Sequence, residues 1–247
     1  MSTILQKACV ALQEGDVIAA LEAVEVHLAE DKEDGHAWEM LGLIQYQRDQ
    51  FSESVSALEM AALLVPLKPM SRICIAYGYS QLGRVELARD LLCELIDDET
   101  LSTYLLLQVA TGLDSIGEPS LAMHACRVSL ERDPESAQSY YDLGFYASEC
   151  GYPAKYTESL ARKAITLEPE NVCYRVGISS LLAQQKRHEE AFGFVSELTL
   201  EQIESITCRC CILKVMALYK RHNDTQRAEI CYQQYQKLEL FDRNNPC

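Results

Sequence analysis

The stretch that decides the fold is residues 36–66, HAWEMLGLIQYQRDQFSESVSALEMAALLVP. Its apolar residues recur at spacings of three and four, which places them on one face of a helix. The pattern breaks near Asp49, resumes in a second helical segment, and ends at a proline, which cannot continue a helix. The residues that carry the pattern are Trp38, Leu41, Gly42, Leu58, Ala61 and Pro66. This stretch therefore predicts two amphipathic helices joined by a tight turn.

The same pattern recurs along the whole chain with a period of about 34 residues, which is typical of a helical solenoid. A second clear copy begins at Tyr140, continues through Leu143 and Gly144, and ends at Pro169. We expect an all-α chain in which residues 1–242 form a single array and residues 243–247 a short tail. The expected units are 1–34, 35–68, 69–102, 103–136, 137–171, 172–205 and 209–242.

These motifs resemble those of tetratricopeptide repeat (TPR) proteins over nearly the entire chain. The second unit matches that family at the six residues named above and at Phe51, and the fifth matches at Tyr140, Leu143, Gly144, Gly151, Ala164 and Pro169. The chain departs from the pattern at Ser54 and Thr157, which replace the usual alanine, and the last two units lack the closing proline. The resemblance implies a right-handed α-α superhelical solenoid of about seven units. Its concave face, built from the first helix of each unit, would hold an extended or helical peptide.

The composition limits which classes of partner and which cellular compartment are expected. The 247 residues carry a net charge of −15, with the acidic excess concentrated in residues 1–102. The negative electrostatic potential of such a chain argues against nucleic acid or an anionic membrane as the partner. No apolar run approaches the roughly 20 residues of a membrane-spanning helix, and we see no signal peptide. Because 11 cysteines would be a liability in an oxidising compartment, a cytoplasmic location is expected.

A second apolar set on the first helices is expected to line the concave groove and bind an apolar segment of a partner. Its members are Leu43, Tyr46, Ile73, Tyr77, Tyr104, Leu107, Tyr141 and Phe145. The alternative is that some of them belong to the core, because packed helix pairs bury more than a narrow stripe.

Cations occur on the inner face of only the last unit, at Lys214, Lys220 and Arg221, where they could receive an acidic peptide end. The alternative is a solvated helix end that complements the macrodipole. Some TPR proteins bind the C-terminal carboxylates of heat-shock chaperones through a clamp of Lys, Asn and Arg. Here the corresponding positions are Leu5, Cys9, Met40, Met70 and Cys74, so the clamp is absent.

No catalytic motif is present, and we expect neither an enzyme nor a cofactor. The richest cysteine cluster is residues 208–211, with Cys231 on the facing helix. On one helix Cys208 and Cys211 share a face while Cys210 points elsewhere, so this segment would offer at most two metal ligands, and Cys231 a third. We therefore expect no metal site, and interpret these thiols as small buried hydrophobes.

The sequence thus favours a non-enzymatic protein–protein interaction module, an adaptor, scaffold or chaperone-like protein that binds a peptide or partner protein in an apolar concave groove. One alternative is a peptide-responsive regulatory sensor, and another is a metal-binding or enzymatic protein that uses the Cys208–Cys231 region. The last helix is rich in apolar residues and has no polar helix after it, which predicts weak self-association through the C-terminal unit. These residues are Ile230, Tyr232, Tyr235, Leu238 and Phe241.

Overall fold

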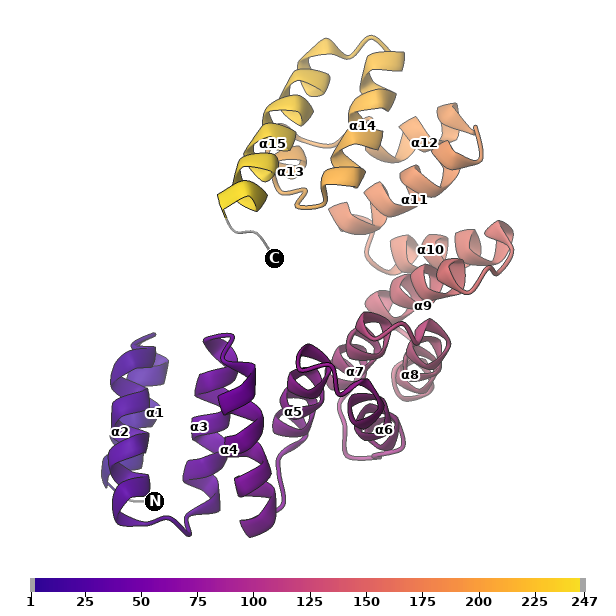
Figure 1. Cartoon of the computed structure of the whole chain (residues 1–247). Helices are drawn as coiled ribbons and strands as arrows, with labels where there is room; N and C mark the ends of the chain where they lie inside the picture. The colour runs from indigo at the N-terminus through magenta and orange to yellow at the C-terminus, as the bar shows by residue number, and fades with distance from the viewer. Residues whose placement is uncertain (1–2, 245–247) are drawn as a thin grey trace. The chain divides into compact units, whose positions relative to one another are not determined.

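The computed structural model describes residues 3–244, and the side chains of residues 4–240. The described chain contains fifteen α-helices and no strand (Figure 1). In chain order they are α1 (Thr3–Gln13), α2 (Val17–Glu30), α3 (Gly35–Gln47), α4 (Phe51–Leu64), α5 (Pro69–Gln81), α6 (Val85–Ile96), α7 (Thr103–Ser115), α8 (Pro119–Arg132), α9 (Ala137–Glu149), α10 (Ala154–Leu167), α11 (Val172–Gln184), α12 (His188–Val195), α13 (Leu200–Glu204), α14 (Arg209–Arg221) and α15 (Thr225–Asn244).

The helices group into two compact units, Met1–Arg132 and Asp133–Cys247. The first unit contains the pairs α1/α2, α3/α4, α5/α6 and α7/α8, and its first helices α3, α5 and α7 contact one another in sequence. The second unit contains α9/α10, α11/α12 and α14/α15, with the short α13 packed on α15. Every repeat expected from the sequence holds one such pair, and the chain is an all-α solenoid of stacked helical pairs. None of the described helices combines the length and the apolar character needed to cross a bilayer.

The turn inside each pair has one residue with a left-handed backbone, and these residues mark the repeat register. Four of them are glycines, which adopt positive φ without steric cost. The other three are an aspartate, a lysine and an asparagine with φ between 57° and 63°. The set is Gly15, Asp49, Gly83, Gly117, Gly151, Lys186 and Asn223. The packing of the two helices therefore requires a left-handed residue in the turn even where the sequence has no glycine there.

The two departures from the repeat pattern are accommodated by hydrogen bonds. Ser54 is fully buried, and its hydroxyl donates to the carbonyl of Gly42 at 2.8 Å, where α3 and α4 meet. A Cβ at Gly42 would lie 2.5 Å from Cγ of Leu58, so glycine permits this close approach. In the fifth helical pair, α9/α10, the hydroxyl of Thr157 donates to the carbonyl of Ala154 at 2.9 Å. Buried hydroxyls are tolerated when they find such partners.

The sixth pair is followed by an additional short helix within the expected repeat. The helix α12 ends at Val195, because Thr199 and Gln202 form a capping box that starts the separate helix α13. Four carbonyls in the last turn of α12 and in the segments that flank α13 accept hydrogen bonds from side chains of α11, α14 and α15. The bonds run from Arg175 to Phe194, from Tyr219 to Val195, from Arg227 to Leu198 and from Gln234 to Ile206.

Candidate functional site

The junction of the second and third helical pairs carries a cluster of three aromatic rings. Tyr46 of α3, Phe51 of α4 and Tyr77 of α5 contact one another edge to face, with centroids 5.7–6.0 Å apart. Burial raises the pKa of Tyr46 to about 12, so its phenol stays protonated at neutral pH. These rings are partly buried, and each uses part of its surface to contact the others. They are both packing residues and candidate binding residues.

The remaining groove residues predicted in this unit divide by exposure. Ile73 and Leu107 are only 8% and 9% exposed, so they belong to the packed interior and not to an open surface. The reason is that α5 and α7 each contact helices on two sides, which widens the buried arc. Tyr104 is 63% exposed, and Leu43 is partly buried. The exposed part of the predicted set is therefore smaller than the sequence suggests.

A cavity of about 570 Å³ lies along α1 and α3 and includes Leu43. Its apolar lining comes from both helices and includes Leu5, Cys9 and Met40, three of the positions at which the family resemblance would place a carboxylate clamp. The complete lining is Leu5, Cys9, Leu12, Asp34, His36, Glu39, Met40, Leu43, Ile44, Gln47 and Lys68. A lining that combines apolar side chains with a few polar groups is typical of sites that bind side chains of a partner.

Glu39 is the buried acid of this cavity, with 2% of its surface exposed. One carboxylate oxygen accepts the backbone N–H of Lys68 at 2.8 Å and the hydroxyl of Ser71 at 2.7 Å. The Lys68 ammonium lies 3.5 Å from the other oxygen. Burial alone would raise the pKa of Glu39, but these hydrogen bonds and the ammonium outweigh it and lower the pKa below its ordinary value. Glu39 is therefore ionised at neutral pH and ties α3 to the start of α5.

In the second unit the predicted residues Tyr141 and Phe145 lie on α9. Phe145 is 51% exposed, whereas the ring of Tyr141 packs on that of Tyr174 with a centroid distance of 4.8 Å. The ring of Tyr141 also lies against Gly177 of α11, where any Cβ would collide with it. Beside it, burial raises the pKa of Asp142 to about 6. The α9–α11 face is thus aromatic and carries a carboxyl that titrates near neutral pH.

A second cavity, of about 350 Å³, lies between α11 and α14 and brings together two of the three predicted cations. Lys214 and Arg221 line it, seven residues apart on one face of α14, while Lys220 points away from it. The hydroxyl of Ser180, a residue only 7% exposed, lines the same cavity and has no hydrogen-bond partner among the described residues. The complete lining is Ser180, Ala183, Gln184, His188, Lys214, Ala217, Leu218 and Arg221. A cationic pocket with a free buried hydroxyl is suited to an anionic group.

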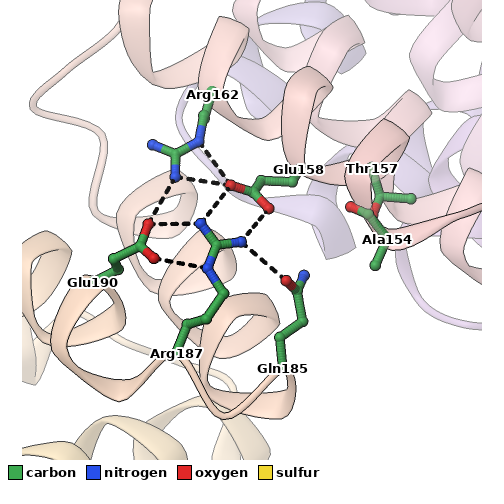
Figure 2. Close-up of polar contacts among 7 residues, drawn as sticks. All are labelled: Ala154, Thr157, Glu158, Arg162, Gln185, Arg187 and Glu190. Atoms are coloured by element: carbon green, nitrogen blue, oxygen red, sulfur yellow. Dashed lines mark hydrogen bonds and ion pairs between the residues drawn. The ribbon is translucent and has the colours of Figure 1, made fainter.

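A third hollow, of about 470 Å³, lies over α10 and the turn before α12. Figure 2 shows that its two arginines are paired: Arg187 bonds to Glu158 at 2.6 Å and to Glu190 at 2.6 Å, and Arg162 bonds to Glu158 at 2.8 Å. Because these two arginines and two carboxylates neutralise one another, the network connects neighbouring helical pairs and is not itself a charged ligand site. Sequence reasoning missed it, since its members are 28–29 residues apart.

The cysteine segment corrects one prediction. Cys208 is not inside α14 but is its N-cap, with an extended backbone (φ −87°, ψ 115°), and its Sγ accepts the N–H of Cys211 at 3.4 Å. The Sγ atoms of Cys208 and Cys210 are 3.0 Å apart, and those of Cys210 and Cys211 are 4.0 Å apart. The prediction that Cys210 points elsewhere is therefore wrong. Cys231 is fully buried and is not part of this group.

No protein-family model and no curated protein matches this sequence. Among solved structures, a tetratricopeptide repeat protein from Parabacteroides merdae aligns with 95% of this chain and 91% of its own, at a TM-score of 0.71 and 14% identity. The C-terminal part of a TPR repeat-containing protein from Cytophaga hutchinsonii covers 95% of both chains, at a TM-score of 0.67 and 12% identity. YrrB, described as a TPR protein with an unusual peptide-binding site, covers 69% of this chain and 88% of its own, at a TM-score of 0.57 and 17% identity. The chain thus has the tetratricopeptide-repeat fold.

Proposed function

We propose that this chain is a non-enzymatic protein-interaction module that binds an apolar segment of a peptide or partner protein in the cavity along α1 and α3. The observation that carries the proposal is this cavity of about 570 Å³, because the positions of a carboxylate clamp are occupied there by apolar groups. A side chain that enters it contacts Leu5, Met40 and Leu43 and leaves the charged rim hydrated. Burial of one large apolar side chain contributes about 1.5–3 kcal/mol. An adaptor, a scaffold or a chaperone that protects a hydrophobic segment would all use such a surface.

The second unit supports a different specificity within the same function. The cavity between α11 and α14 presents Lys214, Arg221 and the free hydroxyl of Ser180, so we assign to it an acidic side chain or the carboxyl end of a peptide. We further propose that the seven pairs form one continuous array. Ten described cysteines are free thiols, which is consistent with the reducing cytoplasm as its location.

The last helix supports weak self-association. Ile230, Tyr235 and Leu238 pack against the core of the second unit, but Tyr232 and Leu240 of α15 remain 46% and 59% exposed. The side chain of Phe241 falls outside the described residues. Two exposed apolar side chains form a small contact area, so we expect an interaction that is populated only at high protein concentration.

The experiment is a selection of peptides from a random display library on the full chain, followed by titration of the selected peptides by fluorescence anisotropy. The test variant is Leu43→Glu, which places a charge on the cavity wall. The matched control is Leu63→Glu, because Leu63 of α4 is 79% exposed and does not line the cavity. We expect the selection to yield apolar peptides. These peptides should bind the control variant with native affinity and Leu43→Glu at least about tenfold more weakly. Equal binding by both variants, with circular dichroism unchanged, would refute the cavity assignment.

A further inference from the structure

We propose that Cys208, Cys210 and Cys211 form a three-thiolate site for a soft monovalent cation of the Cu(I) class. The three Sγ atoms all lie within 4.8 Å of one another at the N-terminal end of α14. Three sulfur atoms at such separations can surround a single ion after small side-chain rotations, because metal–sulfur bonds are about 2.3 Å long.

The backbone explains why three cysteines meet in so short a segment. Two residues separate Cys208 from Cys211, and only the N-cap conformation folds the Cys208 side chain back over the first turn of α14. That fold brings its sulfur to Cys210 at 3.0 Å, while Cys211 donates its N–H to the same sulfur. The cluster is therefore already gathered in the metal-free chain.

Exposure distinguishes this group from cysteines that serve as small hydrophobes. Cys208 and Cys210 are exposed and Cys211 is partly buried, whereas structural thiols such as Cys126 and Cys231 are fully buried. The two exposed thiols offer an open path of entry, while Cys211 also packs against the neighbouring core, which fixes one side of the group. Neither packing nor a hydrogen bond to another helix accounts for the position of Cys210.

The number and type of ligands select the class of ion. Thiolate ligands favour soft metals such as Cu(I) and zinc, but structural zinc sites need four protein ligands in a tetrahedron. Within the described side chains no fourth sulfur, imidazole or carboxylate joins the group. A three-coordinate site is compatible with Cu(I). On binding, each S–H bond is replaced by an S–Cu bond, three protons pass to solvent, and the ion keeps its charge of +1.

The site lies at the point where the chain enters α14. An ion there would connect Cys208, which precedes the helix as its N-cap, to the first turn of α14. Occupancy would therefore stabilise the start of α14 as well as add a ligand site.

The test is an anaerobic titration of the fully reduced chain with Cu(I) alone, in competition with a coloured Cu(I) chelator. We expect one tightly bound ion per chain in the native protein. The variant Cys208→Ser, Cys210→Ser, Cys211→Ser should bind at least about a hundredfold more weakly, since even changes outside the ligand shell cost 10–100-fold. Serine is a good N-cap, so α14 should form in this variant, and circular dichroism verifies that it does.

Two control variants make the assignment specific. Cys150→Ser removes a partly buried thiol outside the cluster, and Cys173→Ser removes the exposed thiol near Tyr141; both should retain one bound ion with native affinity. The proposal is overturned if the triple variant binds Cu(I) as tightly as the native chain or if Cys173→Ser abolishes binding. It is equally overturned if stoichiometric zinc displaces the copper, or if Cys208 and Cys210 are found as a disulfide that anaerobic reduction does not open.

Discussion

Replacing Glu39 with alanine should destabilise the first unit substantially, because two donors lose their acceptor in a buried place. Hydrogen bonds to a charged group contribute about 1.5–3 kcal/mol each, and Glu39 accepts one from the Lys68 N–H and one from the fully buried Ser71 hydroxyl. The ammonium of Lys68 is well exposed and adds little. Allowing for relaxation around the vacated site, we expect the free energy of unfolding to fall by about 3–4 kcal/mol.

The variant Glu39→Gln separates the charge from the hydrogen bonds. The amide oxygen of glutamine can accept both donors, but neutral hydrogen bonds are about half as strong as charge-assisted ones. We therefore expect a loss of about 1–2 kcal/mol. The control is Glu25→Ala, which changes an exposed glutamate of α2 and should alter stability by less than about 0.5 kcal/mol.

The dependence on pH provides a second, independent check. The folded pKa of Glu39 is lowered, so its contribution is fully present above the unfolded pKa of about 4.3 and is lost as pH falls through the folded value. Because glutamine does not titrate, the stability difference between the native chain and Glu39→Gln should shrink as pH falls below about 4. Urea unfolding followed by circular dichroism, with hydrogen exchange to localise the effect to α3 and α5, measures both quantities. A loss below about 1 kcal/mol in Glu39→Ala, or a difference from Glu39→Gln that is independent of pH, would contradict the reasoning.

Three further predictions test other features. Gly42→Ala should lower the free energy of unfolding by about 1–3 kcal/mol, because its Cβ collides with the facing leucine of α4. The control Gly193→Ala, whose Cβ meets nothing within 4 Å, should be neutral or stabilising in urea unfolding. Equal effects of the two substitutions would refute the close-approach argument. Asp142→Asn should stabilise the chain by about 1–2 kcal/mol at pH 8, because burial disfavours the ionised carboxylate and raises its folded pKa to about 6. The gain in stability should fade as pH falls from 6 toward 4, where the carboxyl becomes protonated. A gain that persists in acid would contradict this explanation. Light scattering at high concentration should detect weak self-association that Tyr232→Ser with Leu240→Ser removes, and a native chain that stays strictly monomeric would exclude it.

The sequence was sufficient to predict the helical pairs, because the three-and-four spacing of apolar residues and the repeat period agree throughout the chain. It indicated the turn near Asp49 but did not show that Asp49 and Lys186 adopt a left-handed backbone, since neither residue carries a strong local signal for it. The short helix α13, which starts at the capping box of Thr199 and Gln202, was not predicted, because the two-helix repeat pattern contains no third helix.

Two errors at the candidate sites have a common physical origin, the treatment of each helix by itself. Ile73 is buried because α5 has neighbours on both sides, which a helical wheel of one segment does not include. Cys210 meets Cys208 because the latter lies just outside the helix, where the helical periodicity used to place it no longer applies. Side chains at helix ends and between repeats are therefore the least predictable from periodicity alone.

Residues that test binding must be ones whose contacts are not already used for packing. Tyr46 and Tyr77 contact Phe51 and each other, so substituting them would weaken the junction of the second and third pairs as well as any ligand contact. Leu43 lines the cavity along α1 and α3 but also packs against the core cluster that contains Val55 and Leu58, so the binding of a Leu43 variant must be read together with its free energy of unfolding. In the second unit the same logic favours Lys214 and Arg221 over Tyr141, whose ring covers Gly177. A loss of binding on changing Lys214 therefore reports on ligand contact, whereas a loss on changing Leu43 or the tyrosines reports on contact only where the free energy of unfolding is unchanged.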